Sequence, residues 1–206
     1  MAKRVGRLLR AMERGPCPHG FSYKHYVTME ALDIIQKYYP FDSALRQLLL
    51  HHSRQVALRA LDIARRHPEL GLDAAFLEQA AMVHDVGIFL CNAPGIGCHG
   101  PAPYLMHGPL GAALLRQEGL ESLARVCERH TGTGLTALEI ERRGLPLPVA
   151  DLLPETLEEQ VVCYADKFFS KSHPERVRTV EQTAASLEKF GPEGVAKFMG
   201  WAERFE

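Results

Sequence analysis

The sequence predicts an all-α, single-domain helical bundle, and three observations carry that prediction. Apolar residues recur at helical spacing from about residue 28 onward. Strand signals are nearly absent, because no alternating apolar and polar run is flanked by hairpin turns. The 206 residues contain no internal repeat and no flexible linker, and this length suits one well-buried core. We therefore expect an N-terminal segment over residues 1–27 and one helical domain over residues 28–206.

Eight helices follow from apolar spacing, capping residues and Gly or Pro terminators. The first begins at a Thr28 cap, and the third has Asp73 as its cap and Gly87 as its terminator. A shorter helix is indicated near residues 136–143. The expected ranges are 28–38, 43–66, 73–86, 108–118, 121–130, 155–171, 175–190 and 192–204.

Two segments break the helical pattern. Residues 90–106, LCNAPGIGCHGPAPYLM, are rich in Gly and Pro, and a loop of this length inside a compact domain is usually functional or mobile. It directly follows a histidine and aspartate pair, His84 and Asp85, which favours a functional loop. Residues 144–155, GLPLPVADLLPE, are broken by proline and are expected to form a surface connection.

The composition excludes several classes of function. Lys and Arg number 24 against 25 Asp and Glu, so the formal net charge of −1 provides no global field for binding nucleic acid. No apolar run is long enough to cross a bilayer, and basic residues interrupt the N-terminus where a signal peptide needs apolar ones. We therefore expect a cytoplasmic protein that binds neither nucleic acid nor membrane. The five cysteines form no C-x-x-C pair and are expected to be small core residues.

Several polar residues fall on apolar helix faces. His84 and Asp85 stand side by side within the apolar run AAMVHDVGIF. His52 lies on the apolar stripe of the second helix, whereas the adjacent His51 lies on its polar face. The same test predicts that the side chains of three further residues face the core, namely His107, His130 and Asp166. Each alone is more often a hydrogen-bonded core residue than a metal ligand, but six together are expensive to bury unless a bound cation collects them.

These residues resemble the HD superfamily of metal-dependent phosphohydrolases. LLHHSRQVALRALDIA is similar to its first histidine helix, AAMVHDVGIF to its name-giving motif and CYADKFF to its terminal aspartate helix. The segments HGPLGAALL and ERHTGTG resemble the extended form of the family, which has two additional histidines and holds two metals. The resemblance implies a bundle of the HD-domain type, with its motif core at about 45–170 and C-terminal helices over 175–204.

The resemblance also implies the cofactors and the reaction. The ligands it implies are His52, His84, Asp85 and Asp166 for one divalent metal ion, and Asp85, His107 and His130 for a second. The ions would be Fe, Mn, Zn or Mg, and a hydroxide that bridges them would attack a phosphate ester or anhydride. Asp85 would also orient the attacking water. The expected partner is a small phosphorylated substrate, with nucleotides and dinucleoside polyphosphates as the leading candidates.

The sequence departs from the family pattern at one position. Many two-metal relatives read H-D-x-G-K, whereas this chain has Ile88 in place of the lysine. Lys167, directly after Asp166, is the candidate replacement that would contact phosphate, although a lysine on that helix is equally often a solvated surface group. The basic stretch KSHPERVR, residues 171–178, could assist polyanion binding, but such a run is more often a helix cap with its solvated first turn. His99, in the Gly and Pro loop, is left outside the expected site.

Two other classes of function stay open. Some two-iron proteins with similar ligand sets activate dioxygen and cleave C–C or C–P bonds, so a two-iron oxygenase is one alternative. A metal-binding regulatory module is the other, ranked lower because all six ligand positions are filled. The sequence leaves the substrate, the metal and the oligomeric state open, with a homodimer among the possible states.

Overall fold

The computed structural model describes residues 29–206, which form nine α-helices and one small sheet. The prediction of an all-α bundle is confirmed, whereas the segment 1–27 and the Thr28 cap lie outside the described residues. No helix of the described part is both long and apolar enough to span a membrane. The helices are α2 (Met29–Tyr38), α3 (Ala44–Arg66), α4 (Ala74–Val83), α5 (His107–Gln117), α6 (Glu121–Arg129), α7 (Ala137–Arg142), α8 (Leu157–Asp166), α9 (Val180–Leu187) and α10 (Pro192–Phe205).

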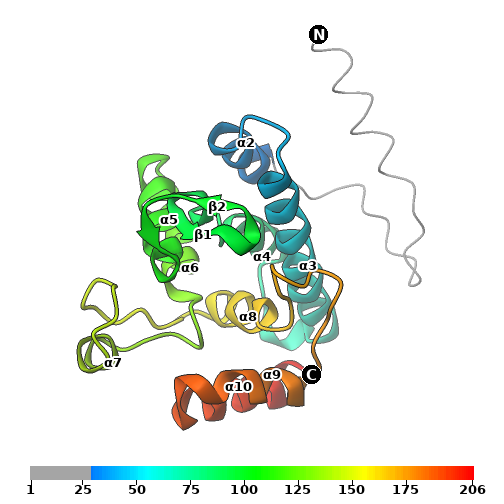
Figure 1. The fold of residues 1–206 in the computed structure, drawn as a ribbon. Coiled ribbons are helices and arrows are strands. Elements are labelled where there is room, and N and C mark those ends of the chain that lie inside the picture. The colour runs from blue at the N-terminus through cyan, green and yellow to red at the C-terminus, as the bar shows by residue number, and fades with distance from the viewer. Residues whose placement is uncertain (1–28) are drawn as a thin grey trace.

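The long helix α3 packs against both α4 and α8. Its N-terminus is capped by Ser43, whose side chain accepts a hydrogen bond from the backbone N–H of Arg46. The centre of the predicted apolar stripe is buried, and His51 is exposed as predicted. In Figure 1, α8 lies between the α5–α6 pair and the α9–α10 pair. The middle of the bundle is therefore enclosed by helices from both halves of the chain.

A capping box begins α8, and an ion pair holds α8 against α6. The Thr156 side chain accepts from the backbone N–H of Glu159, and the Glu159 side chain accepts from the backbone N–H of Thr156. The Glu159 carboxylate is buried and also accepts a hydrogen bond from Nε of Arg125 at 2.9 Å. The ion pair fixes how the two helices lie against each other. Asp166 ends α8, and His130 directly follows α6.

One hydrophobic cluster runs from α2 to α10. Tyr164 of α8 packs against Phe198 and Phe205 of α10, with ring centroids 5.0 and 5.5 Å apart. The Tyr164 hydroxyl donates to Oε1 of Glu206 at 2.7 Å. This continuity supports one domain over residues 28–206, which stays a prediction. The cysteines of the described part are free and buried, as expected, namely Cys91, Cys98, Cys127 and Cys163; Cys17 lies outside it.

Residues 90–106 contain strands that the sequence did not predict. The strands β1 (Cys91–Ala93), β2 (Cys98–His99) and β3 (Ala102–Pro103) form one sheet in the order β2-β1-β3. β1 pairs antiparallel with β2 and parallel with β3. Strands of two or three residues are too short to show an alternating pattern. The sheet gives a defined backbone to the loop that follows Asp85.

Two helices near the C-terminal end are shorter than predicted. α8 ends at Asp166 and α9 begins only at Val180, so residues 167–179 form turns instead of continuing either helix. Pro174 lacks the N–H that a helix interior needs, and a capping box between Thr179 and Gln182 sets the start of α9. The basic stretch 171–178 therefore lies in a loop and not in the first turn of a helix.

The expected surface connection over residues 144–155 is partly buried. Leu147 and Leu152 join Leu135 and Ile140 in a second, smaller hydrophobic cluster. Leu152 also exchanges two backbone hydrogen bonds with Leu135, at 3.0 and 2.8 Å. Most of the segment is exposed, as expected of a surface connection, and the two leucines anchor it to the bundle.

Gly87 lies where two backbones approach closely. A Cβ at this position would stand 2.3 Å from the carbonyl oxygen of His107 and 2.5 Å from the backbone nitrogen of Gly111. We expect Gly87→Ala to lower the free energy of unfolding by about 1–3 kcal/mol, because overpacking forces the backbones apart. Urea unfolding measures the change. The control is Gly200→Ala in α10, where an added Cβ meets no atom within 4 Å, and it should leave stability unchanged or slightly higher. Equal stabilities of the two variants would contradict this packing.

Candidate metal centre

The six inward-turned residues predicted from the sequence lie together in the bundle. Each is buried, with no more than 8% of its surface exposed. His52 lies within α3, whereas the other five lie at or next to helix ends. In chain order these are His84 at the C-cap of α4, Asp85 directly after it, His107 at the start of α5, His130 at the C-cap of α6 and Asp166 at the end of α8.

The end of α4 brings two adjacent side chains into one site. The helix was predicted to reach residue 86 but ends at Val83, and tight turns follow it. The N–H of Val86 donates to the Val83 carbonyl, and the N–H of Ile88 donates to the Asp85 carbonyl, each at 3.0 Å. Neighbouring residues of a continuous helix point about 100° apart. The turn instead lets the side chains of His84 and Asp85 face the same centre.

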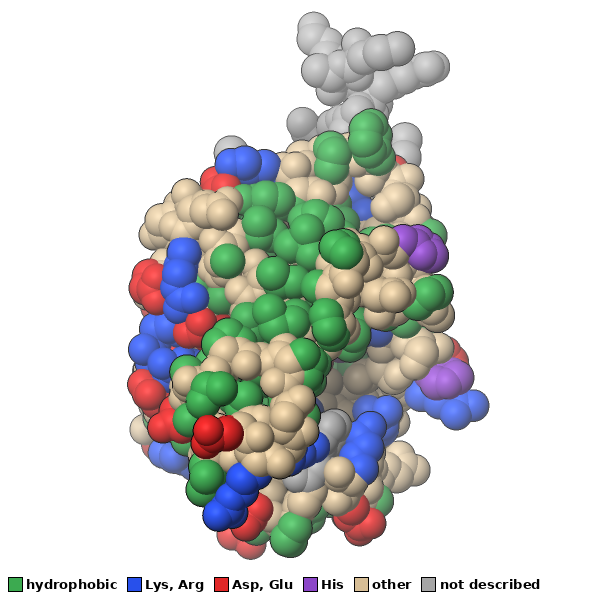
Figure 2. All heavy atoms as spheres, turned by 60° about the vertical axis from the view of Figure 1, so that its left-hand side comes forward, with side chains coloured by type: hydrophobic (Ala, Val, Ile, Leu, Met, Phe, Trp, Pro, Cys, Tyr) green, Lys and Arg blue, Asp and Glu red, His purple; other side chains and the backbone are tan. Residues whose placement is uncertain are grey.

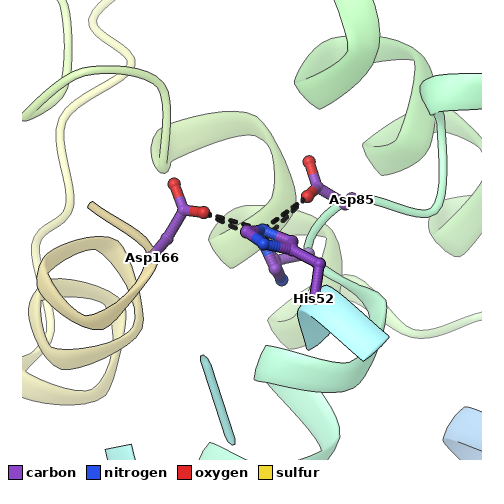
Figure 3. A group of neighbouring side chains, drawn as sticks. His52, Asp85 and Asp166 are labelled. Carbon is purple, nitrogen blue, oxygen red and sulfur yellow. Dashed lines mark hydrogen bonds and ion pairs between the residues drawn. The ribbon is translucent and has the colours of Figure 1, made fainter. Parts of the chain in front are cut away.

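The first cluster contains His52, His84, Asp85 and Asp166. Nε2 of His52 lies 2.9 Å from Oδ1 of Asp166 and 3.1 Å from Oδ2 of Asp85. Nε2 of His84 lies 3.1 Å from the same oxygen of Asp85 and 3.5 Å from Oδ1 of Asp166. Figure 3 shows the side chains of His52, Asp85 and Asp166 pointing toward one another from separate parts of the chain.

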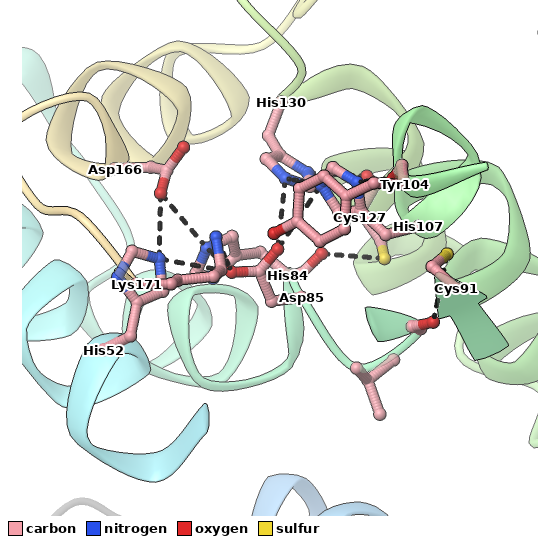
Figure 4. A network of polar contacts seen from close by, with 12 residues as sticks. His52, His84, Asp85, Cys91, Tyr104, His107, Cys127, His130, Asp166 and Lys171 are labelled. Atoms are coloured by element: carbon pink, nitrogen blue, oxygen red, sulfur yellow. Dashed lines mark hydrogen bonds and ion pairs between the residues drawn. The ribbon is translucent and has the colours of Figure 1, made fainter. Parts of the chain in front are cut away.

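The second cluster contains Asp85, His107 and His130. Oδ1 of Asp85 lies 3.4 Å from Nε2 of His107 and 3.5 Å from Nε2 of His130. The two imidazole nitrogens are 3.0 Å apart (Figure 4). Because Oδ2 of Asp85 faces the first cluster, its carboxylate stands between the clusters with one oxygen on each side. In each cluster the candidate ligand atoms all lie within 4.8 Å of one another, which fits a metal ion.

Backbone carbonyls fix the protonation of three imidazoles. Each donates from Nδ1 to the carbonyl oxygen three residues before it, at 2.6 Å for His84, 2.7 Å for His107 and 2.7 Å for His130. A carbonyl oxygen can only accept, so each Nδ1 carries a proton and the Nε2 atom of each ring faces the centre. Histidines that bind metals are commonly oriented in this way.

The electrostatics of the second cluster favour a cation. His107 and His130 direct Nε2 lone pairs at each other across 3.0 Å. Burial lowers the pKa of His107 to about 3 and also lowers the pKa of His130, so neither imidazole readily takes a second proton. Among the described residues, Oδ1 of Asp85 has no hydrogen-bond partner. A buried carboxylate oxygen and two imidazole lone pairs in this arrangement fit a divalent metal ion.

The first cluster differs because it holds two carboxylates. Burial alone would lower the pKa of His84, but Asp85 and Asp166 outweigh that effect and raise it to about 9. Both Asp85 and Asp166 have pKa values well below the usual range, because the neighbouring positive groups outweigh their burial. Metal ligands must be deprotonated, so a metal ion that binds this cluster would displace the proton of His84.

The backbone adds to this preference for positive charge. The C-terminal ends of α4, α6 and α8 meet at the centre, and the C-terminal end of a helix carries partial negative charge. Of the helices that contribute the six residues from their ends, α5 alone begins there. Helix ends and side chains therefore favour a cation at the same place.

Two lysines that follow α8 in the chain, Lys167 and Lys171, also reach the centre. Nζ of Lys167 donates to Oδ2 of Asp166 at 2.6 Å and to the carbonyl oxygen of His130 at 2.8 Å. Nζ of Lys171 lies 2.5 Å from Oδ2 of Asp85 (Figure 4). Sequence reasoning missed Lys171, since the only signal was the basic stretch that contains it.

A cavity of about 460 Å³ opens beside the centre. It is lined by His107, His130 and Asp166 from the two clusters. The cationic residues along it are Lys167, Lys171, Arg178 and Lys189, and Ile96, Tyr104 and Phe169 add apolar surface. His99 is exposed on β2 and does not line this cavity, in line with its exclusion from the expected site.

Comparison with known protein families matches this centre to one of them. The family model of the HD domain matches residues 49–170, which is more than half of the chain. The chain belongs to the HD domain family. The matched stretch contains all six residues of the two clusters, and it confirms the resemblance predicted over about residues 45–170.

The HD domain chain is also similar to parts of curated proteins. It is 32% identical over 124 residues to a tRNA (cytidine(56)-2'-O)-methyltransferase of Picrophilus torridus. The matched stretch covers 60% of this chain and 32% of that protein. It is 28% identical over 175 residues to a protein of the same name from Thermoplasma volcanium, covering 84% of this chain and 45% of that protein. An uncharacterized protein of Methanocaldococcus jannaschii is 36% identical over 107 residues, covering 52% of this chain and 56% of that protein. The chain thus spans between a third and about half of the length of these relatives. No solved structure matches it.

Proposed function

We propose that this HD domain protein is a metal-dependent phosphohydrolase that cleaves a phosphate ester or anhydride of a nucleotide or dinucleoside polyphosphate. The observation that carries the proposal is the Asp85 carboxylate, whose two oxygens face two different clusters of imidazole nitrogens. Membership of the HD family supports the class of metal-dependent hydrolases. The nucleotide substrate is our extension of that class.

We assign the two clusters to two divalent ions of Fe, Mn, Zn or Mg. His52, His84, Asp85 and Asp166 would hold one ion, and Asp85, His107 and His130 would hold the other. When bound, such ions supply a water of lowered pKa and neutralise the oxygens of the phosphate under attack. His84, His107 and His130 contribute Nε2 lone pairs that their Nδ1 hydrogen bonds keep in place. Asp85, which stands between the clusters, orients the attacking water by accepting its hydrogen bond.

Lys167 is the residue that we propose for contact with the phosphate. It uses two of its three N–H donors on Asp166 and on the carbonyl oxygen of His130. The third donor remains for an oxygen of the substrate in the cavity that Lys167 lines. Phosphoryl transfer depends chiefly on such positioning and charge neutralisation, so this contact would assist the reaction without covalent chemistry.

The cavity supports a small phosphorylated molecule as the substrate. Its volume of about 460 Å³ lies within the range of small-molecule sites. Arg178 and Lys189 on its lining suit the phosphate groups, and Tyr104 offers an aromatic face to a base. One face of the Tyr104 ring is stacked on the imidazole of His107, with ring centroids 4.7 Å apart, so a base would use the opposite face of the ring.

RNA is a second class of substrate to consider, since the names of two relatives refer to tRNA methylation. We transfer neither that activity nor that substrate, because this chain covers only 32% and 45% of those proteins. On the face in Figure 2, hydrophobic side chains fill the middle, while Lys and Arg mix with Asp and Glu along the left edge. The net charge of −1 does not favour binding of a long polyanion.

Metal removal and a substrate panel test the proposal together. We expect protein treated with chelator to be inactive, and reloading with Mn²⁺ or Fe²⁺ to restore phosphate release from mononucleotides or dinucleoside polyphosphates without oxygen. Phosphate release from each substrate is the measurement, with RNA oligonucleotides that carry terminal phosphates in the same panel. Activity that requires dioxygen and a two-iron centre would instead indicate an oxygenase. Metal binding without turnover on any substrate would indicate a regulatory module.

A further inference from the structure

Lys171 is a buried cation on a loop. Residues 167–179 connect α8 to α9 through turns. An isolated β-bridge pairs Phe169 with Val177 within this loop. The side chain of Lys171 is nevertheless only 13% exposed, and its Nζ lies 2.5 Å from Oδ2 of Asp85. This ion pair with a buried carboxylate makes Lys171 a charged ammonium group next to the two clusters.

This ammonium group and a metal ion would compete for one oxygen. Oδ2 of Asp85 also faces Nε2 of His52 and Nε2 of His84, each at 3.1 Å. A divalent ion coordinated by these atoms would sit about 2.0–2.2 Å from the carboxylate oxygen and use its lone pair. Two positive groups at one oxygen repel each other strongly in a buried site. Lys171 must therefore withdraw from Oδ2 when a metal ion binds there.

The surroundings of Lys171 allow that withdrawal. Both ends of the loop are anchored: Arg178 donates from its backbone N–H to the carbonyl of Phe168 at 2.9 Å, and from Nη1 to the carbonyl of Lys167 at 3.1 Å. Between these anchors, Lys171 lines the cavity of about 460 Å³. Lysine carries its charge on a flexible four-carbon stem, so rotation of the side chain can move Nζ without displacing a helix. Arg178 lines the same cavity, and two cationic side chains there favour an anion between them.

We propose that Lys171 is a cation with two positions. It neutralises Asp85 while the centre is free of metal, leaves Oδ2 when a divalent ion binds, and then contacts the phosphate group of the substrate in the cavity. Only this last contact rests on the proposed function. Ile88 is fully buried, and among the described residues Lys167 and Lys171 pair with Asp166 and Asp85 of the two clusters.

Metal affinity tests the first position. Metal-free wild-type protein and Lys171→Met are titrated with Mn²⁺ by calorimetry, and the variant should bind the first ion about tenfold more tightly, because the competing state is removed. The matched control is Lys197→Met. Nζ of Lys197 donates to the carbonyl oxygen of Thr133 at 3.3 Å, so the control removes a lysine from the region but no described contact with Asp85. Unchanged affinity in Lys171→Met would overturn competition at Oδ2, and so would an equal gain in the control.

Lys171→Arg gives an independent test if the methionine variant does not fold. A guanidinium group pairs with a carboxylate through two parallel hydrogen bonds and leaves it less readily than an ammonium group does. We expect Lys171→Arg to bind Mn²⁺ more weakly than the wild type. Affinity equal to or tighter than that of the wild type would contradict the proposal.

Binding of inorganic phosphate tests the second position without requiring turnover. With Mn²⁺ loaded, Lys171→Met should bind inorganic phosphate about tenfold more weakly than the wild type, since one charge-assisted hydrogen bond is lost. Lys197→Met should bind it normally. Equal phosphate affinity in wild type and Lys171→Met would overturn the second position. A protein that passes both binding tests but hydrolyses no nucleotide would refute the proposed function and leave this inference standing.

Discussion

Asp85→Asn is expected to abolish the binding of both metal ions and to lower the rate of phosphate release by about a thousandfold, the loss that several kcal/mol of charge stabilisation represents. The effect should be this large because one carboxylate serves both clusters, with Oδ2 toward His52 and His84 and Oδ1 toward His107 and His130. An amide of the same shape has one oxygen and no negative charge. Metal content per chain and the rate of phosphate release measure the two losses.

A matched substitution on the surface separates this effect from a general loss of charge. Asp62→Asn removes a carboxylate that pairs with Arg65 and Arg66 on the exposed face of α3. It should change stability by only about 0–1 kcal/mol and leave metal content unchanged, since exposed ion pairs contribute little. Thermal unfolding shows whether each variant is folded. If the Asp85→Asn protein is folded and still holds two ions per chain, Asp85 is not a ligand of both ions and the account is wrong.

His130→Ala and His52→Ala are each expected to lower the metal content from two ions per chain to one. His130→Ala leaves Asp85 and His107 as the described ligands of the second cluster, which are too few to hold an ion tightly. His52→Ala removes a ligand from the first cluster and leaves the second complete. We expect the rate of phosphate release to fall by about a hundredfold or more in each variant, because one ion cannot stabilise both the attacking and the leaving oxygen.

His51→Ala is the control for both variants. His51 precedes His52 in α3 but is exposed, and its contact is a 3.5 Å approach to the carbonyl oxygen of Pro174. This variant should keep two ions and wild-type activity. Metal analysis of the folded proteins decides the outcome. Two ions in His130→Ala, or a loss of metal in His51→Ala, would contradict the assignment of the clusters.

Helical periodicity predicted much of the fold and the direction of the key side chains. It separated His52 from His51, two identical neighbours, because residues on adjacent positions of a helix face different ways. It also turned His130 and Asp166 inward. Periodicity could not show that side chains from helices far apart in the sequence meet at one point, since that depends on how the helices pack. The family resemblance supplied this part, and the distances around Asp85 agree with it.

The features missed from the sequence depend on turns and short contacts. Lys171 meets Asp85 because α8 ends at Asp166 and the loop that follows folds back over the centre. No apolar period marks such a loop, and Pro174 indicated only that the helix had to stop. The sheet of β1, β2 and β3 escaped prediction because its strands have two or three residues. The early end of α4 at Val83 likewise arises from the tight turns around Gly87.

A crystal of the protein grown with Mn²⁺ and measured at a wavelength where manganese scatters anomalously gives the most direct test of a centre shared through Asp85. We predict two anomalous peaks about 3.5–4 Å apart. One should lie among His52, His84, Asp85 and Asp166, and the other among Asp85, His107 and His130. Well-ordered side chains at these positions with no anomalous peak beside Asp85 would contradict a metal centre in this HD domain.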